Sequence, residues 1–445
     1  MFSALNRHFI LPLYLKRHDD KRLERMAELE QLQWLSVEEL KARQLVKLKN
    51  IVRYAYENVP FYQNKFQGIG FRPDDLNSFE DYKQLPTLTK KDIQIHLDEL
   101  ISKNISKDRL LKDSSGGSTG IPTVFYTDKS NRDLRRGAAL MSDSWTGWQV
   151  GEKSSYLWGA DRDTDVIRSL KDKIAHKFIH RTSLLNAFEL DEATMRRHVE
   201  TLRREKPTLI IAYANVAFFF GKFLLESGLS IPSPKGIVCS AETLTEEKRA
   251  VIEKAFGCKA LNRYASREIG LIAAECPHQS GLHINTEDVY VEIEQNGDSD
   301  FGEIIVTDFN NHAMPFIRYR TGDVGVPSID ACTCGRGMPL IKEVKGRTSD
   351  FILHPDGHLI HGESFSHAFY GIREIARFQV HQKSLDSLDV NLIKGDGFST
   401  AHKGMVEKKV KEIIGDKVNV TINEVDDIPV PISGKFKFAI SDIVN

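Results

Sequence analysis

The sequence is poor in cysteine and carries no surplus of either charge. Its 445 residues include five cysteines, an odd and sparse set that excludes a disulfide framework. Such sparing use of cysteine is typical of a reducing compartment, so we expect a cytoplasmic protein. Lys and Arg together number 61, Asp and Glu number 62, and the net charge is −1. This balance gives no sign of a nucleic-acid or polyanion binder.

Long hydrophobic runs are also missing. The longest early run, 9–15, contains a proline and is far shorter than the about 20 residues that span a bilayer, so we expect no transmembrane segment. The run lacks a small-residue cleavage site, which argues against a signal peptide. The surrounding N-terminal arm, residues 2–18, is amphipathic. Its sequence leaves open whether the arm packs on the protein, on a partner or on a membrane surface.

The patterning changes along the chain. The first hundred residues are rich in Leu, Glu, Lys and Arg at helical spacing, and helix starts are expected at Ser78 and Thr89. From Ser154 to Ser266 strands and helices alternate, which predicts α/β units around a largely parallel sheet. From Asp288 onward the strands come with turn signals, and one of them is expected over 315–325. This part is predicted to be antiparallel.

The last hundred residues have the pattern of a small α+β domain. A turn-rich, charged segment, 345–357, precedes them and is typical of a boundary. The predicted fold class is therefore α/β, with a helical N-terminal extension, a large domain of sheets flanked by helices, and a small C-terminal domain. We expect the two domains to cover 1–346 and 347–445.

A segment rich in Ser, Thr and Gly, "DSSGGSTGIPTVFYTD" (113–128), is a candidate anion site. Glycines let the backbone curl until several N–H groups point at one spot, and hydroxyls add donors. A flexible linker is the alternative interpretation of so short a run. No Lys-Ser or Lys-Thr pair follows the final glycine, so the segment is not a Walker loop and a P-loop kinase is excluded.

Four more motifs follow in a fixed order: Tyr264-Ala-Ser-Arg-Glu268, Tyr319-Arg-Thr-Gly-Asp323, Gly346-Arg-Thr-Ser-Asp350 and Gly434-Lys435. With the Ser/Gly segment they resemble the adenylate-forming superfamily of acyl-CoA synthetases and amino-acid adenylation domains. The sequences of residues 51–66 and 74–93 are similar to the phenylacetate–CoA ligase branch of this superfamily. The pair "YASREIGLIAAEC" and "CTCGRG" resembles its capsular-polysaccharide-associated, CapK-like members.

The resemblance implies an ATP- and Mg²⁺-dependent ligase. Such an enzyme turns a small-molecule carboxylic acid into an acyl adenylate and passes the acyl group to an acceptor. The thiol of CoA is the first candidate acceptor, and an amine or a carrier thiol supplied in trans are the variants. A role in surface-polysaccharide biosynthesis is implied too, with a catalytically degenerate scaffold protein as the non-enzymatic alternative. The identity of the acid and the existence of a homodimer stay open.

The resemblance also assigns roles to single residues. Glu268 would hold Mg²⁺ between phosphates, and Asp323 would accept both ribose hydroxyls. Arg347 would reach a phosphate or ribose oxygen. Lys435 would swing in to stabilise the charge that develops at the α-phosphate and acyl oxygen, with Lys437 as the competing candidate. The domain hinge would fall at Ser349 and Asp350.

The rest of the expected nucleotide site consists of the phosphate-binding residues 114–120 and of the residues at two predicted strand ends, 240–242 and 262–266. Tyr264 would stack on adenine. The alternatives are ordinary ones: a surface acid for Glu268, a turn aspartate for Asp323 and surface lysines at the C-terminus. The remaining candidate residues are Ser114, Ser115, Gly116, Gly117, Ser118, Thr119, Gly120, Ser240, Ala241, Glu242, Asn262, Arg263, Ala265 and Ser266.

The acid pocket is the least defined part of the predicted site. Arg267 stands where relatives usually carry Ser or Thr, and it would contact a phosphate or the substrate acid. Trp158 and Tyr213 would line the acyl pocket, although ordinary core packing explains aromatic residues at such positions equally well. The same two interpretations apply to Tyr156 and to the run 218–220.

A second candidate site consists of Cys276, His283, Cys332 and Cys334. Three sulfurs and an imidazole suit a closed, tetrahedral structural Zn²⁺ site. His278 competes with His283 as the fourth ligand, and buried free cysteines beside a surface histidine are the alternative interpretation. The other two cysteines, Cys239 and Cys258, are expected to be core thiols.

Overall fold

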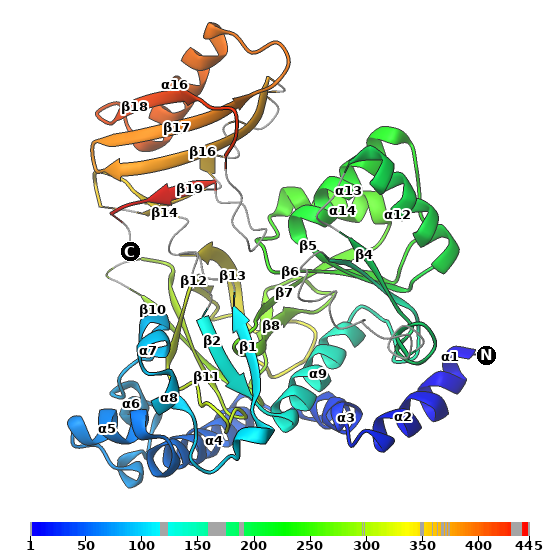
Figure 1. Cartoon of the computed structure of the whole chain (residues 1–445), viewed down its shortest axis with the longest axis vertical. Coiled ribbons are helices and arrows are strands. Elements are labelled where there is room, and N and C mark those ends of the chain that lie inside the picture. The colour runs from blue at the N-terminus through cyan, green and yellow to red at the C-terminus, as the bar shows by residue number, and fades with distance from the viewer. Residues whose placement is uncertain are drawn as a thin grey trace. The chain divides into compact units, whose positions relative to one another are not determined.

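A computed structural model describes residues 2–115, 123–158, 175–186, 191–295, 297, 299–347, 351–357, 359–362, 364, 365, 369, 372, 374–428 and 438–443. The described residues fall into two compact units. The larger unit holds those up to Thr321 together with Gly325–Val344. The smaller unit holds Gly322–Val324 and the described residues from Lys345 onward. Figure 1 labels the helices and strands of both units.

The larger unit begins with helices, as the sequence predicts. Ser78 and Thr89 begin α6 and α7 as expected, because each hydroxyl accepts the N–H of an aspartate three residues on, whose carboxylate accepts the N–H of the cap residue. These first elements are α1 (Phe2–Leu5), the π-helical η1 (Asn6–Ile10), α2 (Leu11–Arg17), α3 (Arg22–Leu32), α4 (Val37–Asn58), α5 (Pro60–Gly68), η2 (Pro73–Asp75), α6 (Phe79–Lys83), α7 (Lys90–Ile95), α8 (Leu97–Leu100) and η3 (Lys107–Arg109).

A β-hairpin brackets the Ser/Gly segment. Strands β1 (Leu111–Ser115) and β2 (Thr123–Thr127) pair antiparallel, with Ser115 opposite Thr123. The pairing brings the two ends of the segment side by side, and residues 116–122 between them lie outside the described part of the chain. Helix α9 (Lys129–Ser144) follows, and the Asp128 carboxylate caps its N-terminus.

The predicted parallel sheet is confirmed. Strands β4, β3, β5, β6 and β7 lie side by side in this order, and each neighbouring pair is parallel. Helix α14 begins at the Thr245 cap and ends at Gly257, whose φ of +67° is left-handed. The elements are β3 (Ser154–Trp158), η4 (Ala175–His180), β4 (Thr182–Asn186), α12 (Glu192–Glu205), β5 (Leu209–Tyr213), α13 (Ala214–Ser227), β6 (Gly236–Ser240), α14 (Glu246–Phe256) and β7 (Lys259–Ser266).

Helices cover both faces of this sheet, and the strand sequences show why. In β5, Ile210 and Ala212 pack into one cluster with α12, α13 and α14. Their neighbours Leu209 and Ile211 pack into another cluster with α2, α3 and α9 on the opposite face. Successive strand side chains point to opposite faces, so a strand that is apolar throughout is stable only when both faces are covered. Figure 1 shows the two groups of helices on either side of β5 and β6.

The same sheet continues as an antiparallel section. Its order is β10-β11-β12-β13-β9-β8, joined to β7, so the described strands form one sheet of eleven. The strand expected over 315–325 begins only at Tyr319, because Arg318 has φ +48° and turns the chain there. The elements are β8 (Gly270–Glu275), β9 (Leu282–Ile284), β10 (Val289–Gln295), β11 (Gly302–Asp308), β12 (Tyr319–Pro327) and β13 (Leu340–Arg347).

The smaller unit is α+β, as predicted. A four-stranded sheet of order β18-β17-β16-β19 packs against α16, whose Val406, Val410 and Ile414 are fully buried with Val380 and Val390. The elements are β14 (Phe351–Leu353), β15 (Leu359–His361), β16 (Ile375–Ser384), β17 (Ser387–Lys394), α16 (Thr400–Ile414), β18 (Asn419–Glu424) and β19 (Ala439–Ser441). Among the described residues of both units, we find no helix of the length and apolarity that crossing a bilayer requires.

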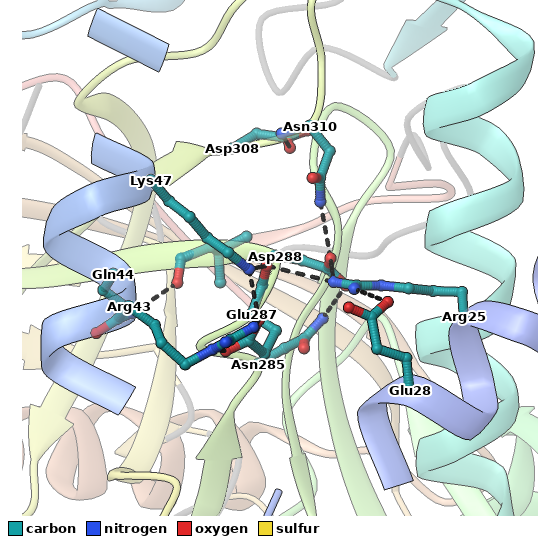
Figure 2. A network of polar contacts seen from close by, with 11 residues as sticks. Arg25, Glu28, Arg43, Gln44, Lys47, Asn285, Glu287, Asp288, Asp308 and Asn310 are labelled. Carbon is teal, nitrogen blue, oxygen red and sulfur yellow. Dashed lines mark hydrogen bonds and ion pairs between the residues drawn. The ribbon is translucent and has the colours of Figure 1, made fainter. Parts of the chain in front are cut away.

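A buried polar network fixes the N-terminal helices on the large sheet (Figure 2). Arg25 of α3 donates to the carboxylate of Asp288, which also accepts the side-chain amides of Asn285 and Asn310, each at 2.7 Å. The guanidinium of Arg25 further pairs with Glu28 at 2.6 Å. Asp288 lies directly before β10, so this network anchors α3 to the start of that strand.

Glu287 anchors α4 in the same region (Figure 2). Its carboxylate accepts Arg43 Nε at 2.7 Å and Lys47 Nζ at 2.5 Å. Burial by itself would raise the pKa of Glu287, but the hydrogen bonds from Arg43 and Lys47 outweigh it and lower the pKa to about 2. The ionised carboxylate therefore stabilises the packing of α4.

Glu287→Gln should lower the melting temperature at neutral pH. The depressed pKa corresponds to about 3 kcal/mol of stabilisation by the ionised group. Because the folded pKa lies below the usual 4.5, this stabilisation is complete above about pH 5 and is lost as the pH falls toward about 2. Thermal unfolding of both proteins across this range measures the difference. The exposed Glu57→Gln is the matched control, and a difference that does not shrink in acid would contradict the assignment.

Candidate active site

The second motif, 264–268, forms the end of β7 and the turn into β8. Ser266 pairs with Gly270 across this turn, and the Ser266 hydroxyl accepts the N–H of Ile269 at 3.2 Å. Gly270 has φ +92°, and a Cβ at this position would lie 2.9 Å from Cγ of Arg135. Glycine is therefore required here, both for the backbone conformation and for the close approach of Arg135.

Arg135 of α9 holds this turn from its backbone side. One guanidinium nitrogen, Nη1, donates to the carbonyl of Arg267 at 3.0 Å, and Nη2 donates to the carbonyl of Glu268. Nη2 also lies 3.1 Å from the buried carboxylate of Asp308. Arg135 belongs to none of the five motifs, and nothing in the sequence pairs it with residues more than a hundred positions away. Sequence analysis missed Arg135 entirely, as it missed its partner Asp308.

The arrangement leaves the Glu268 carboxylate able to bind a cation. Glu268 is 5% exposed, and its Oε1 accepts the hydroxyl of Tyr319 at 3.5 Å, a long hydrogen bond. An ionised carboxylate has room for about four hydrogen bonds or ligand contacts, so this contact uses little of its capacity. A hard oxygen ligand of this kind suits Mg²⁺. Tyr319 is the first residue of the third motif. The second and third motifs, which the sequence shows only as consecutive, are therefore in contact in the fold.

The hairpin around the Ser/Gly segment approaches the same turn. The guanidinium of Arg267 lies 3.7 Å from the carboxylate of Asp113, which also accepts the N–H of Ser114 at 2.8 Å. Both charged side chains are about one-third exposed. Ser114 and Ser115, the first residues of the predicted phosphate-binding run, therefore lie close to the Glu268 turn. Arg267, unusual at its position, faces this hairpin.

The predicted residues after β6 also have defined places. The Ser240 hydroxyl donates to the carbonyl of Arg263 at 3.1 Å and ties β6 to β7. Ala241 has φ +68°, a conformation that non-glycine residues rarely adopt and that is enriched at functional sites. Glu242 accepts the N–H of Asn215 at 2.8 Å, at the start of α13. Its carboxylate is thus already engaged at a helix N-terminus.

Other residues predicted to bind the nucleotide instead make contacts that hold strand β7 in place. The N–H of Asn262 donates to Glu275 at 2.7 Å, and the guanidinium of Arg263 pairs with the buried carboxylate of Asp143 on α9. Burial raises the pKa of Asp143 despite this pairing. Tyr264 is 8% exposed and its hydroxyl donates to Thr321 at 3.3 Å. Stacking of Tyr264 on adenine stays a prediction, as does a role for Ala265, which follows a bulge in the strand pairing.

Two of the predicted acid-pocket residues are in contact. The rings of Trp158 and Tyr213 stack with centroids 3.9 Å apart and planes at 26°. They end the neighbouring parallel strands β3 and β5, at the carboxyl edge where open α/β sheets bind ligands. Phe218 and Phe220 are buried in the core beside α14, so core packing explains these two residues, whereas Phe219 is exposed.

Several predicted residues cannot be placed. The run 116–120, the hinge pair Ser349 and Asp350, and Lys435 lie outside the described residues. Asp323 lies in β12 directly after Gly322, which has φ +74°. Arg347 is the last residue of β13. The roles assigned to all of these residues stay predictions.

The four predicted zinc ligands lie together in the larger unit. Their donor atoms are all within 4.8 Å of one another. Cys276 Sγ and Cys332 Sγ are 3.7 Å apart, and Cys334 Sγ is 3.4 Å from Nε2 of His283. Two sulfurs bound tetrahedrally at about 2.3 Å are about 3.8 Å apart, and a sulfur and a nitrogen about 3.6 Å. The donor set and its spacing therefore fit Zn²⁺.

The surroundings of this cluster orient its histidine. Nδ1 of His283 lies 3.3 Å from the carbonyl of Met338, an acceptor that keeps the proton on Nδ1 and leaves Nε2 for a metal. Burial lowers the pKa of His283 to about 4, so the ring is neutral at pH 7. The competing His278 lies on the surface and contacts the Thr333 hydroxyl at 2.8 Å. Cys239, which is buried, and Cys258, which is half-buried, stand apart.

Comparison with known proteins gives relatives over the whole chain. The chain is 27% identical to protein CapK of Staphylococcus aureus over an alignment 461 positions long, gaps included, which covers 100% of this chain and 96% of the relative. It is 24% identical to the phenylacetate-coenzyme A ligase of Escherichia coli K12, covering 90% and 95%. The corresponding ligase of Pseudomonas putida is 26% identical and covers 76% of each chain.

A solved structure of another protein has a similar fold. A crystal structure of 2-hydroxyisobutyryl-CoA ligase, in the postadenylation state, matches with a TM-score of 0.72 and 18% identity over 93% of this chain and 92% of the other. The chain belongs to the adenylate-forming superfamily. Within it, residues 352–442 match the CapK C-terminal domain, and with the CapK relative this match assigns the chain to the CapK-like branch.

The contact between Arg135 and Asp308 makes a prediction about stability. Arg135→Met should cost about 3 kcal/mol or more, because it leaves a buried carboxylate without its partner. Asp308→Asn in the same protein should restore part of the loss, since no unpaired charge remains. The urea midpoints of the wild type, both single variants and the double variant measure this coupling. Losses that simply add up would show that the pair does not stabilise the turn.

Proposed function

We propose that this chain activates a carboxylic acid with ATP and transfers the acyl group to the thiol of CoA. In the first step a carboxylate oxygen attacks the α-phosphorus of ATP, and pyrophosphate leaves. In the second step the thiol sulfur attacks the acyl carbon, and AMP leaves. The observation that carries the proposal is the β7–β8 turn, which presents a buried Glu268 beside Tyr319 and near the hairpin of the Ser/Gly segment. The three phenylacetate–CoA ligase and CoA ligase relatives support the choice of acceptor.

Each part of the site has a task in this proposal. The N–H groups and hydroxyls of Ser114 to Gly120 hold the β- and γ-phosphates. Glu268 would hold Mg²⁺, which would supply positive charge to the phosphates when bound. Asp323 accepts the ribose hydroxyls, and Arg347 contacts a phosphate or the ribose. Lys435 stabilises the charge that develops during adenylation, and Trp158, Tyr213 and Arg267 surround the acid. The CapK-like branch carries the further proposal that the product serves surface-polysaccharide biosynthesis.

The decisive test is acid-dependent exchange of labelled pyrophosphate into ATP. Aryl-acetic, aryl, short acyl and amino acids form the panel, and we expect at least one of them to drive exchange. The active acid is then offered with CoA or with amines, and thioester formation with CoA is expected. Amide formation in its place would favour an amine ligase. Folded protein that binds ATP and shows no exchange with any acid would favour a scaffold.

Lys435→Ala should separate the two half-reactions. We expect exchange to fall roughly a hundredfold, because the lysine acts on charge that develops in the transition state. Thermal stability and ATP binding should be unchanged, and a supplied acyl adenylate should still react with CoA. Lys437→Ala is the matched control and should have little effect. An equal loss of both half-reactions in Lys435→Ala would contradict this role.

We also propose that Cys276, His283, Cys332 and Cys334 bind a structural Zn²⁺. The site would join the end of β8 and strand β9 to the connection between β12 and β13, two segments more than 50 residues apart. Its closed set of four protein ligands leaves no position for substrate, so its role is stability.

Freshly isolated protein should contain about one Zn²⁺ per chain. Cys332→Ser and His283→Ala should release the metal and lower the melting temperature, because the loop that carries Cys332 loses its attachment. Cys258→Ser and His278→Ala are the matched controls and should retain the metal. Elemental analysis and thermal unfolding measure both effects. Metal-free protein prepared without chelators, or zinc retained in His283→Ala and lost in His278→Ala, would contradict the ligand set.

A further inference from the structure

The N-terminal arm, residues 2–18, has two apolar faces. On one face Leu11 and Leu15 are 6% and 2% exposed and pack into the core shared with α3 and α9. The opposite face carries an outward stripe of apolar side chains that are between 47% and 72% exposed. A helix that is apolar on both faces is normally covered on both faces. The outward stripe consists of Phe2, Leu5, Phe9 and Leu13, at intervals of three or four residues along α1, η1 and α2.

Polar contacts hold the arm in a fixed position on the larger unit. The buried side-chain amide of Asn6 donates to the carbonyls of Phe178 and Ile179, at 3.1 and 3.0 Å. Arg181 Nη1 donates to the Ser3 hydroxyl at 2.7 Å. A Cβ on Gly151 would lie 2.8 Å from the carbonyl oxygen of Ser3, so only glycine permits this approach. The larger unit therefore presents the outward stripe as part of its surface, at the end of the chain marked N in Figure 1.

Cations outnumber acids in the sequence around the stripe. The nearest acids, Asp19 and Asp20, follow the arm, and Asp20 pairs with Arg22 and Arg136. Neither 2–18 nor 175–186 contains an Asp or Glu. Lys16 continues the spacing of the stripe, and Lys16 and Arg17 are exposed. Phe178, which follows Lys177, is 52% exposed beside the arm, and Lys177 Nζ lies 5.4 Å from the centre of its ring. The face thus combines aromatic and aliphatic groups with positive charge, the composition of helices that lie in a membrane interface.

The positive charge beside the stripe distinguishes between two partners that could cover it, a second copy of the chain and a membrane surface. A second copy of the chain would bring the same cations face to face, since a two-fold contact pairs identical patches. Like charges across an interface oppose association. Phosphate headgroups of a bilayer have the complementary charge, and its acyl boundary accepts Phe and Leu side chains. We propose that the outward stripe and its flanking cations dock this protein on the surface of a membrane that contains anionic lipids.

Co-sedimentation of the full chain with lipid vesicles tests this proposal. Vesicles that contain phosphatidylcholine and phosphatidylglycerol should bind the protein at least about tenfold more tightly than vesicles of phosphatidylcholine alone, because each Lys or Arg near the surface is attracted to anionic headgroups. Added salt should weaken the binding, because it screens exposed charges. Equal binding to both vesicles, or none to either, would overturn the proposal.

Two variants separate the stripe from the rest of the surface. Phe9→Ser/Leu13→Ser should lose at least about tenfold in vesicle affinity, because two of the most exposed apolar side chains are removed. Its melting temperature should be unchanged, since neither side chain is buried. Val46→Ser/Ile95→Ser is the matched control, at residues that are 58% and 63% exposed on α4 and α7, and it should bind like the wild type.

The same variants expose the competing explanations. Wild-type affinity in Phe9→Ser/Leu13→Ser would show that the stripe does not contact lipid. Light scattering that reveals a wild-type dimer, converted to monomer by these substitutions, would mean that a second copy covers the stripe, and would overturn the proposal. A monomeric wild type that binds anionic vesicles through Phe9 and Leu13 supports it.

Discussion

The guanidinium of Arg135 fixes the geometry on which the candidate active site depends. It donates to the carbonyls of Arg267 and Glu268 and pairs with Asp308, so one side chain of α9 connects the β7–β8 turn to the end of β11. The conformation of the β7–β8 turn determines where the Glu268 carboxylate lies. A carboxylate that is 5% exposed can hold a cation productively only if its backbone does not move, because cation sites tolerate little error in ligand position.

The polar contacts continue from this point to the N-terminal helices. Asp308 accepts the N–H of Asn310 at 2.8 Å, the Asn310 amide donates to Asp288, and Asp288 accepts Arg25 of α3. The helices that precede the sheet are therefore connected to the β7–β8 turn through hydrogen-bonded, buried groups rather than through apolar contact alone. Figure 2 shows the part of this chain of contacts from Arg25 to Asp308. Removing any single charged member leaves an unpaired group in the interior, which costs more than the contact itself contributes.

Local pattern predicted most of the fold. Ser78 and Thr89 marked the starts of α6 and α7, and the alternation of strands and helices from Ser154 to Ser266 predicted the parallel sheet. The predictions that were wrong or incomplete concern features that depend on contacts between residues far apart in the sequence. Tyr319 begins β12 because Arg318 turns the chain to reach Glu292 at 3.0 Å, and no local rule contains that partner. In the candidate site, the order of the motifs predicted Glu268 as a site residue. The contacts of Arg135 and the ion pair between Arg263 and Asp143 follow only from tertiary packing.

In the proposed function, the Glu268 turn, held by Arg135, binds the divalent cation that accompanies ATP. A crystal structure of the chain with ATP and Mn²⁺, located by its anomalous signal, measures this directly. We expect a manganese peak at about 2.1 Å from a Glu268 carboxylate oxygen. We also expect that Arg135 still donates to the carbonyls of Arg267 and Glu268. Bound ATP with the metal away from Glu268, or a turn released from Arg135, would contradict this role of the turn.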